Sequence, residues 1–412
     1  MEVIHPRCAG LDVHKQTVVA CVRVAGDGPL KQEVRTFATT TSALLELADW
    51  LESFGVEHVV MEATGVYWKP VWHVLEGHVE LILANAAHVK NVPGRKTDVN
   101  DATWLADLLA HGLIRASFVP PTAVQELRTL TRTRRQFVRE RGSHVQRIEK
   151  ILEDANIKLG VVLSDITGKS GRAVLHALID GHTKPEELLR CIAPGVKAGR
   201  AELLEALHGH VSAHHRFMLR VHLSHIEALD RAIADIEKEV GCGLQPFRDA
   251  ARLLSTMPGV SSVVANVIVA EIGIDMTRFA TPAHLLSWAC MCPRNDESAG
   301  KRRSTRVRRG CSWLKPTLVQ AAWAAVRVKN GYLQAQFHRL RARRGAKKAI
   351  LAVAASMLTA IWHMLHDHAP WHDLGAAHFD RANAHKTATR LVRRLQQIGY
   401  AVQITPVEVA MA

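Results

Sequence analysis

The chain has 412 residues, and 53 Lys and Arg residues against 39 Asp and Glu residues give it a formal net charge of +14. Hydrophobic residues make up 48% and charged residues 22% of the sequence, which is typical of folded globular domains and argues against a disordered tail or linker. At about 100 to 200 residues per domain, the length predicts two to four domains.

The sequence predicts a soluble, cytoplasmic protein. Its first residues include Glu2 and lack the apolar stretch of a secretory signal. The longest apolar run, residues 350–365, contains Ser356, Thr359 and His363 and is shorter than the roughly 20 residues that span a membrane. The 7 cysteines are scattered and include no CxxC pair, so they predict neither a disulfide framework nor a zinc site and fit a reducing compartment.

Strand and helix patterns alternate over the first 118 residues. Runs rich in β-branched residues predict strands, and apolar residues at helical spacing predict helices. In chain order we expect strands at 9–13, 17–24 and 31–38, a helix at 42–54, a strand at 58–61, a helix at 67–76, a strand at 79–83 and a helix at about 98–111. Three consecutive strands followed by strands separated by helices predict an α/β domain with a mixed sheet of the ribonuclease H type.

Four acidic residues fall at positions that this topology can bring together. Asp12 lies on the first strand, and Glu62 follows the end of the fourth. Asp98 and Asp101 are three residues apart at a helix start, so we expect them to share a face. Carboxylates suit Mg²⁺, and two ions about 3.5 to 4 Å apart can activate an attacking oxygen and stabilise a leaving one. The four acids therefore predict Mg²⁺-dependent phosphodiester cleavage, although Asp98 could instead cap its helix.

Long helices are expected between residues 124 and 240. Apolar residues of the first helix, beginning at Leu127, fall on a seven-residue grid in which Arg134 and Arg141 occupy core positions. A second helix is expected at about 200–240, with a slip in its apolar phase. The two helices predict a coiled-coil hairpin or a dimer contact, and a globular helical bundle fits the same pattern.

Positive charge is concentrated in two segments. Residues 294–348 hold sixteen Lys and Arg against two acids, and residues 128–147 hold a second arginine cluster. A solvated helix face is the simpler explanation, but such local density favours binding to nucleic acid. The candidate phosphate contacts are Arg128, Arg132, Arg135, Lys301, Arg302, Arg303, Arg306, Arg308 and Arg309.

A mostly helical third region is expected from about residue 247, with helices at 313–328 and 345–365. Residues 257–260, Met-Pro-Gly-Val, resemble the turn of a helix-hairpin-helix element, whose N–H groups hold a phosphate. Ser261 replaces the second glycine of that element, so phosphate contact does not follow from the motif. The tail, residues 369–412, includes a basic helix near 387–397 and predicts packing or an auxiliary nucleic-acid contact.

One serine of the third region is placed to act as a nucleophile. Ser298 lies in a glycine-containing loop that continues into three consecutive cations from Lys301, and cations stabilise a charged phosphoryl transition state. Ser304 and Ser312 compete for the role on chemical grounds alone.

These motifs together resemble the DEDD-type insertion-sequence transposases, the family numbered one-ten, also called bridge-RNA-guided recombinases. The matching segments are GLDVHK at 10–15, MEATG at 61–65, KTDVNDA at 96–102, MPGV at 257–260, AEIG at 270–273, SAGK at 298–301 and RG at 309–310. Two groups of motifs in the expected order and separation make the resemblance specific.

The resemblance implies a RuvC-like nuclease domain at 1–118, a helical oligomerisation region at 119–245, a C-terminal transposase domain at 246–368 and a tail at 369–412. It implies that the four acids bind Mg²⁺ and that Ser298 becomes joined to a DNA 5′ phosphate, in a site shared with a neighbouring protomer of a dimer or tetramer. It further implies that a structured guide RNA pairs with donor and target DNA. Two alternatives remain: a junction-resolving endonuclease that uses water, and a non-catalytic nucleic-acid-binding regulator.

Overall fold

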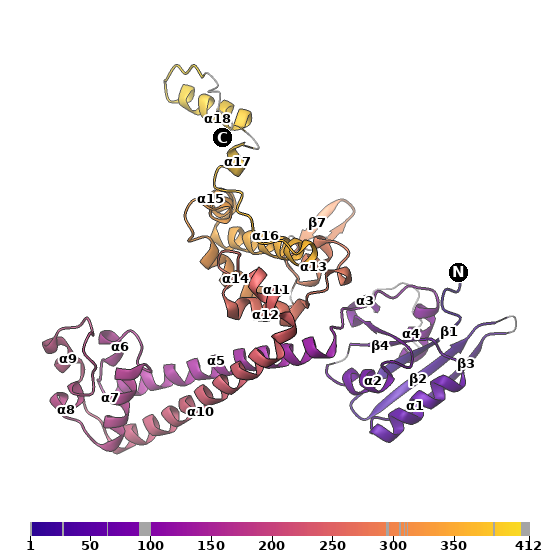
Figure 1. Cartoon of the computed structure of the whole chain (residues 1–412), viewed down its shortest axis with the longest axis horizontal. Helices are drawn as coiled ribbons and strands as arrows, with labels where there is room; N and C mark the ends of the chain where they lie inside the picture. Colours follow the sequence, from indigo (N-terminus) through magenta and orange to yellow (C-terminus); the bar gives the residue numbers. More distant parts are fainter. Residues whose placement is uncertain are drawn as a thin grey trace. The chain divides into compact units, whose positions relative to one another are not determined.

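The computed structural model describes residues 2–26, 29–63, 65–89, 100–293, 296–304, 306–308, 310, 312–381 and 384–404. The chain divides into two compact units, Met1–Val119 and Pro120–Ala412. The first unit contains the main sheet and the second is almost entirely helical (Figure 1).

Five strands form the sheet of the first unit, in the order β3-β2-β1-β4-β5. Their bounds are β1 Arg7–Val13, β2 Thr17–Val24, β3 Lys31–Ala38, β4 His58–Glu62 and β5 Glu80–Ala84. The first three strands pair antiparallel, whereas β1, β4 and β5 run parallel. This mixed sheet confirms the predicted fold class.

Helices cover both faces of the sheet. One face packs Leu11, Val59 and Met61 against the apolar sides of α1, Thr41–Ser53, and α2, Trp68–Leu75. The other face packs Cys8 and Val60 against α4, Asp101–Ala110, while the short α3 spans Ala86–Val89. Successive side chains of a strand point to opposite faces, which divides each strand between the two layers.

The start of α4 differs from the prediction. The helix begins at Asp101, and the side chain of Asn100 caps it by accepting a hydrogen bond from the Ala102 N–H at 2.9 Å. The sequence placed the start at about Asp98, a residue that lies outside the described residues. The expected sharing of one helix face by Asp98 and Asp101 therefore has no support from α4 itself.

Two long antiparallel helices begin the second unit (Figure 1): α5, Thr122–Asp154, and α10, Ala213–Gly243. The arginines at predicted core positions of α5 face acids of α10. Arg134 donates to Glu237 at 2.8 and 2.5 Å. Arg141 Nε lies 2.8 Å from Asp230 Oδ1 without forming a well-directed hydrogen bond. The two arginines at core positions of the seven-residue pattern are thus explained by contacts between α5 and α10 of the same chain.

The second predicted long helix is interrupted. Residues 200–240 form α9, Arg200–Ala206, and then α10, which begins after Ser212. Ser212 accepts a hydrogen bond from the His215 N–H, and the His215 ring accepts one from the Ser212 N–H, so the pair closes a capping box. The prediction of one continuous helix was wrong because the apolar periodicity hid this local cap.

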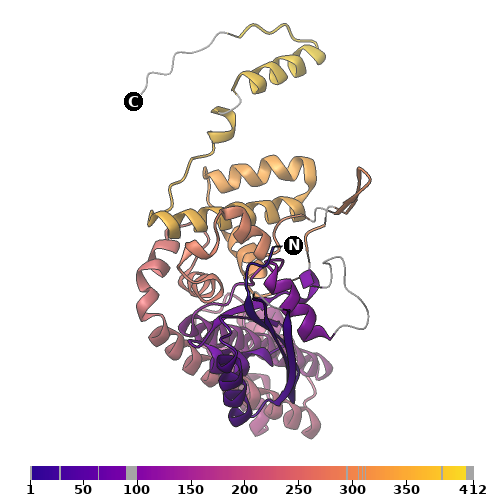
Figure 2. The same cartoon turned by 90° about the vertical axis from the view of Figure 1, so that its right-hand side faces the viewer.

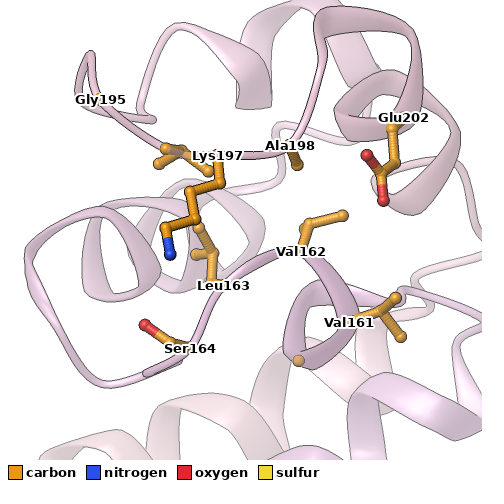
Figure 3. A pocket seen from close by; sticks show the side chains of 10 residues that line it. Val161, Val162, Leu163, Ser164, Gly195, Lys197, Ala198 and Glu202 are labelled. Carbon is orange, nitrogen blue, oxygen red and sulfur yellow. The ribbon is translucent and has the colours of Figure 1, made fainter.

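A small helical group packs against one end of the hairpin: α6 Leu159–Val162, α7 Lys169–Asp180, α8 Pro185–Leu189 and α9. This group contains a pocket of about 630 Å³. Figure 3 shows Lys197, Glu202 and several apolar side chains in its wall. No predicted site residue lines it.

The rest of the second unit is a helical group in which α11, α13, α14 and α15 pack directly against α16, Ala346–Asp367, and which is followed by two tail helices (Figure 2). The helices of this group are α11 Arg248–Leu254, α12 Ser262–Ile272, α13 Pro282–Trp288, α14 Leu314–Ala325 and α15 Tyr332–Arg344, with 3₁₀ turns at Gln245–Phe247 and Met276–Arg278. The tail contains α17 His378–Arg381 and α18 Ala384–Gln397. Helix α16 agrees with the predicted helix at 345–365 to within two residues. At 22 residues it is long and apolar enough to cross a membrane, but 56% of its most apolar window is buried inside the protein. It is the core helix of this domain.

Candidate functional site

Two of the predicted acids occupy neighbouring positions on parallel strands. Leu11 of β1 pairs with Met61 of β4, so Asp12 and Glu62, one residue further along each strand, lie side by side. Adjacent strands are about 4.8 Å apart. Leu11 and Met61 lie in the core beneath α1 and α2, and the next residues therefore face the α4 side of the sheet.

Helix α4 brings a third acid to the same end. Its chain runs antiparallel to β1, because the Ile4 N–H donates to Ala110 O at 2.8 Å and the Cys8 thiol donates to Ala106 O at 3.5 Å. Gly10 permits this close approach, since a Cβ there would lie 2.2 Å from Ala102 O. Asp101, at the exposed start of α4, therefore lies towards the end of β1 that carries Asp12.

The donor chemistry at this end of the sheet is suited to a hard cation, since carboxylate oxygens are preferred ligands of Mg²⁺. Asp12 is already hydrogen-bonded, at 3.1 Å, to the ring of His14, and its side chain is 22% exposed. Among the described residues, no group of three or more His, Cys, Asp or Glu side chains is arranged to hold a metal ion. Asp98, the fourth predicted ligand, is not among them.

The contact between His14 and Asp12 was not anticipated from the sequence. Strand alternation did not extend to His14, because β1 ends at Val13; the His14 N–H donates to Thr17 O at 2.8 Å, which continues the pairing of β1 and β2 by one residue. Because its ring contacts one of the predicted acids, His14 belongs with the candidate site.

Ser298 lies on the first strand of a β-hairpin, where the sequence predicted a glycine-containing loop. The hairpin joins β6, Asp296–Ser298, to β7, Lys301–Ser304, and it projects from the helices in both overall views (Figure 1, Figure 2). Ala299 and Gly300 have φ of 50° and 74°, the positive pair that a tight two-residue turn requires. Ser298 is therefore the last residue before the tip and is paired with Lys301.

The competing serine occupies the other end of the hairpin. Ser304 pairs with Asp296, and its hydroxyl accepts a hydrogen bond from the Arg306 N–H at 3.2 Å. That bond fixes the hydroxyl in a local turn. The side chains of Ser298, Arg302 and Arg303 lie outside what the structure describes, as does all of Arg309.

The predicted phosphate-binding arginines of α5 are engaged inside the protein. Arg128 donates to the carbonyls of Ala270 and Glu271 at 3.2 and 2.6 Å, at the C-terminal end of α12. Arg132 makes two 2.8 Å bonds to the carboxylate of Glu271, a residue that is 1% exposed. These contacts join α5 to the C-terminal helices and leave the guanidinium groups committed to protein partners.

Arg135 has a similar role. It donates to Trp313 O at 2.8 Å and to the Thr317 hydroxyl at 3.3 Å, and its guanidinium lies 5.9 Å from the centre of the Trp313 ring. Burial lowers the pKa of Arg135, and the neighbouring Arg139 lowers it further. Of the other described candidates, Lys301 and Arg306 are exposed, whereas Arg308 donates to Ser287.

The helix-hairpin-helix-like turn packs against protein. Gly259 has φ of 80°, and a Cβ there would lie 2.2 Å from Ala321 O on α14. Ser261 caps α12 by accepting a hydrogen bond from the Val264 N–H at 3.4 Å. The Pro-Gly turn therefore serves the close approach of two helices.

Two family models match the chain. The model of the IS110-type DEDD transposases, described as "Transposase", matches residues 9–157, and the model described as "Transposase IS116/IS110/IS902 family" matches residues 251–338. Together they span more than half of the chain. The first match contains Asp12, Glu62, Asp98 and Asp101, and the second contains Ser298.

A relative is found in Mycobacterium paratuberculosis. The chain is 26% identical over 330 residues to the "Insertion element IS900 uncharacterized 42 kDa protein", a match that covers 71% of this chain and 80% of that protein. Transposases act on DNA, and the DEDD type depends on a divalent metal. Both family matches and this relative agree with the motifs and the mixed sheet: the chain belongs to the IS110 family of insertion-sequence transposases.

Proposed function

We propose that this transposase cuts and rejoins DNA with Asp12, Glu62, Asp98 and Asp101 as Mg²⁺ ligands and Ser298 as a covalent nucleophile. The observation that carries the proposal is the register of the sheet, in which Asp12 and Glu62 are neighbours on parallel strands at the end of β1 that α4 approaches with Asp101. Acidic groups that the chain separates by tens of residues are thereby gathered at one sheet end.

The acids would hold two Mg²⁺ ions, which supply charge neutralisation at the reacting phosphate when they are bound. Asp12 and Glu62 contribute from strands, whose backbone is fixed by hydrogen bonds on both sides. Arg23 of β2 holds α4 in place by donating to Asp107 at 3.1 Å, and it is itself 6% exposed. Because the strands and α4 are held rigidly, the backbone positions of the carboxylate-bearing residues need not change when a metal binds.

In the covalent step, the Ser298 hydroxyl oxygen forms a bond to phosphorus and gives up its proton to solvent or a nearby base. The bond from phosphorus to the 3′ oxygen breaks, and that oxygen leaves as a 3′ hydroxyl after taking a proton. Attack by a 3′ hydroxyl of another strand reverses the step and frees the serine. One phosphodiester is exchanged for another, so the reaction needs no ATP, and the sequence contains no GxxxxGK[ST] motif.

Further partners follow from the same proposal. A structured guide RNA would pair with donor and target DNA, and neighbouring protomers of a dimer or tetramer would combine their acids and serines in a composite site. Lys301, Arg302, Arg303, Arg306 and Arg309 would contact phosphates around the hairpin. The enzyme would act in the cytoplasm, where the DNA of the element resides.

The acids are tested with isosteric variants in extract from cells that carry the complete element, so that any required RNA is present. Asp12→Asn and Glu62→Gln are expected to abolish DNA cutting while leaving DNA affinity within about twofold of wild type, because each changes a ligand charge and no packing contact. Removal of divalent metal with a chelator should do the same, and added Mg²⁺ should restore cutting. Cutting at the wild-type rate by either variant would remove that residue from the site.

A further inference from the structure

The β6–β7 hairpin is pinned at its base by two cations. Its outgoing limb leaves α13 through Cys290, and its returning limb reaches α14 through Arg308. Lys315 Nζ bridges the two limbs by donating to Cys290 O at 3.1 Å and to Arg308 O at 3.0 Å. The Arg308 guanidinium in turn donates to Ser287 of α13, at 3.2 Å to the carbonyl and 2.5 Å to the hydroxyl.

The backbone of the two limbs has unusual local geometry next to the Lys315 contact. Pro293 and Val307 form an isolated antiparallel bridge just above it. Cys290 adopts a left-handed φ of 54°, a strained conformation for a residue other than glycine, and its carbonyl is the one that accepts from Lys315. Gly310 lies so close to Cys290 that a Cβ would be 3.1 Å from the Cys290 sulfur.

Lys315 is itself held on a firm support. It lies in the first turn of α14, between Leu314 and the buried Thr317, and Arg135 of α5 donates to the carbonyl just before that helix and to the Thr317 hydroxyl. A cation in the first turn of a helix is opposed by the helix dipole. The two carbonyl acceptors offset that disfavoured position.

We propose that Lys315 is a positioning residue for strand cleavage, and that Arg308 assists it by tying the returning limb to α13. By clamping the two limbs, Lys315 sets where the tip, and with it Ser298, is delivered to the scissile phosphate. The inference rests on the proposed role of Ser298. It also gives Arg308 a role in holding the hairpin base in place of the phosphate contact that its charge suggested.

The test uses the full chain with its nucleic acids and compares Lys315→Met, Lys315→Arg and Arg308→Gln with wild type. Lys315→Met should slow formation of the covalent protein–DNA adduct at saturating DNA by at least about tenfold, with DNA affinity and melting temperature unchanged. Lys315→Arg should restore much of the rate, because a guanidinium can also donate to both carbonyls. Lys184→Met, which alters a side chain 78% exposed on the distant helical group, is the matched control and should behave as wild type.

Hydrogen exchange of the amides at 296–304 provides a readout that does not depend on chemistry. Faster exchange there in Lys315→Met and Arg308→Gln, together with slower adduct formation, supports the clamp. Unchanged exchange, or a loss of DNA affinity as large as the loss of rate, overturns it. An adduct that persists in Ser298→Ala would refute the proposed function, and with it the catalytic role of the clamp, whereas the exchange result would still report on the hairpin base alone.

Discussion

Glu271 is the buried carboxylate on which the packing of α5 against the C-terminal helices is predicted to depend. It is the only acid in α12, its side chain is 2% exposed, and Arg132 binds both of its oxygens at 2.8 Å. Arg128 lies 3.8 Å from the same carboxylate. We predict that Glu271→Gln, which removes the charge but keeps the shape, destabilises the second unit.

The size of the effect follows from what remains after the change. Removing one partner of a buried ion pair costs about 3 to 5 kcal/mol, because the other charge stays buried without compensation. The Arg132 side chain is 36% exposed, so water can partly solvate it, and Arg128 keeps its bonds to two carbonyls. We therefore expect about 3 kcal/mol, the lower end of that range.

A second ion pair of α5, at the protein surface, provides a matched control. Arg134 of α5 binds Glu237, whose side chain is 50% exposed, and exposed pairs contribute about 0 to 1 kcal/mol. Urea unfolding, followed by tryptophan fluorescence and circular dichroism, compares Glu271→Gln with Glu237→Gln. With a slope of about 3 kcal/mol per molar urea, the former should lower the midpoint by about 1 M and the latter by less than about 0.3 M. Equal shifts in the two variants would refute the reasoning.

Three further predictions concern other parts of the chain. Gly10→Ala should destabilise the first unit by about 3 kcal/mol and abolish cutting, because the new Cβ would lie 2.2 Å from a backbone oxygen of α4; an unchanged thermal melt would contradict this. The double variant Arg343→Gln, Arg344→Gln removes two exposed cations that pair with no acid among the described residues. The plot of log K for DNA binding against log salt concentration should become less steep, by about 2 in the magnitude of its slope. An unchanged slope would mean that these arginines face solvent only. The pKa values of His144 and His222 are lowered by burial and then by the positive charge of neighbouring groups. The Nδ1 atoms of the two rings lie 3.1 Å apart. As the pH falls below the ordinary value of about 6.5, the unfolded chain takes up protons before the folded one, so stability should be full above that pH and fall below it. His222→Gln should flatten the fall in urea midpoint between pH 7.5 and 5.5, and an equally steep fall would argue against this pair as its source.

The sheet and the placement of its acids could be predicted because local patterns determine them. Strands 17–24 and 31–38 were predicted with their observed bounds, and the other three strands of the main sheet were within two residues. Alternation in β1 and β4 fixes which residues face α4, and parallel pairing then brings Asp12 beside Glu62. The end of β4 was missed by one residue: the sequence placed Glu62 after its strand, whereas it is the last residue of β4.

The helical part was harder to predict. Arginines there can contact either phosphate or buried acids, and basic residues can hide the apolar periodicity of a packed helix. The arginines of α5 suggested phosphate contacts, yet Arg128 and Arg132 bind the end of α12 and its buried Glu271. A single charged residue, Glu271, in the mostly apolar stretch at 262–272 was the available signal. Helix α15 was not predicted at all, since its many basic residues mask the apolar contacts of Leu333 and Phe337.

The central claim is a serine-linked, metal-dependent exchange of DNA strands. Its most direct test isolates the protein–DNA adduct under denaturing conditions from extract of cells that carry the complete element, and maps the modified residue by mass spectrometry. Wild type with Mg²⁺ should give an adduct on Ser298 joined to a 5′ phosphate, and Ser298→Ala and Asp12→Asn should give none. Nicked DNA with free ends and no adduct, unaffected by Ser298→Ala, would contradict the account and indicate a nuclease that uses water.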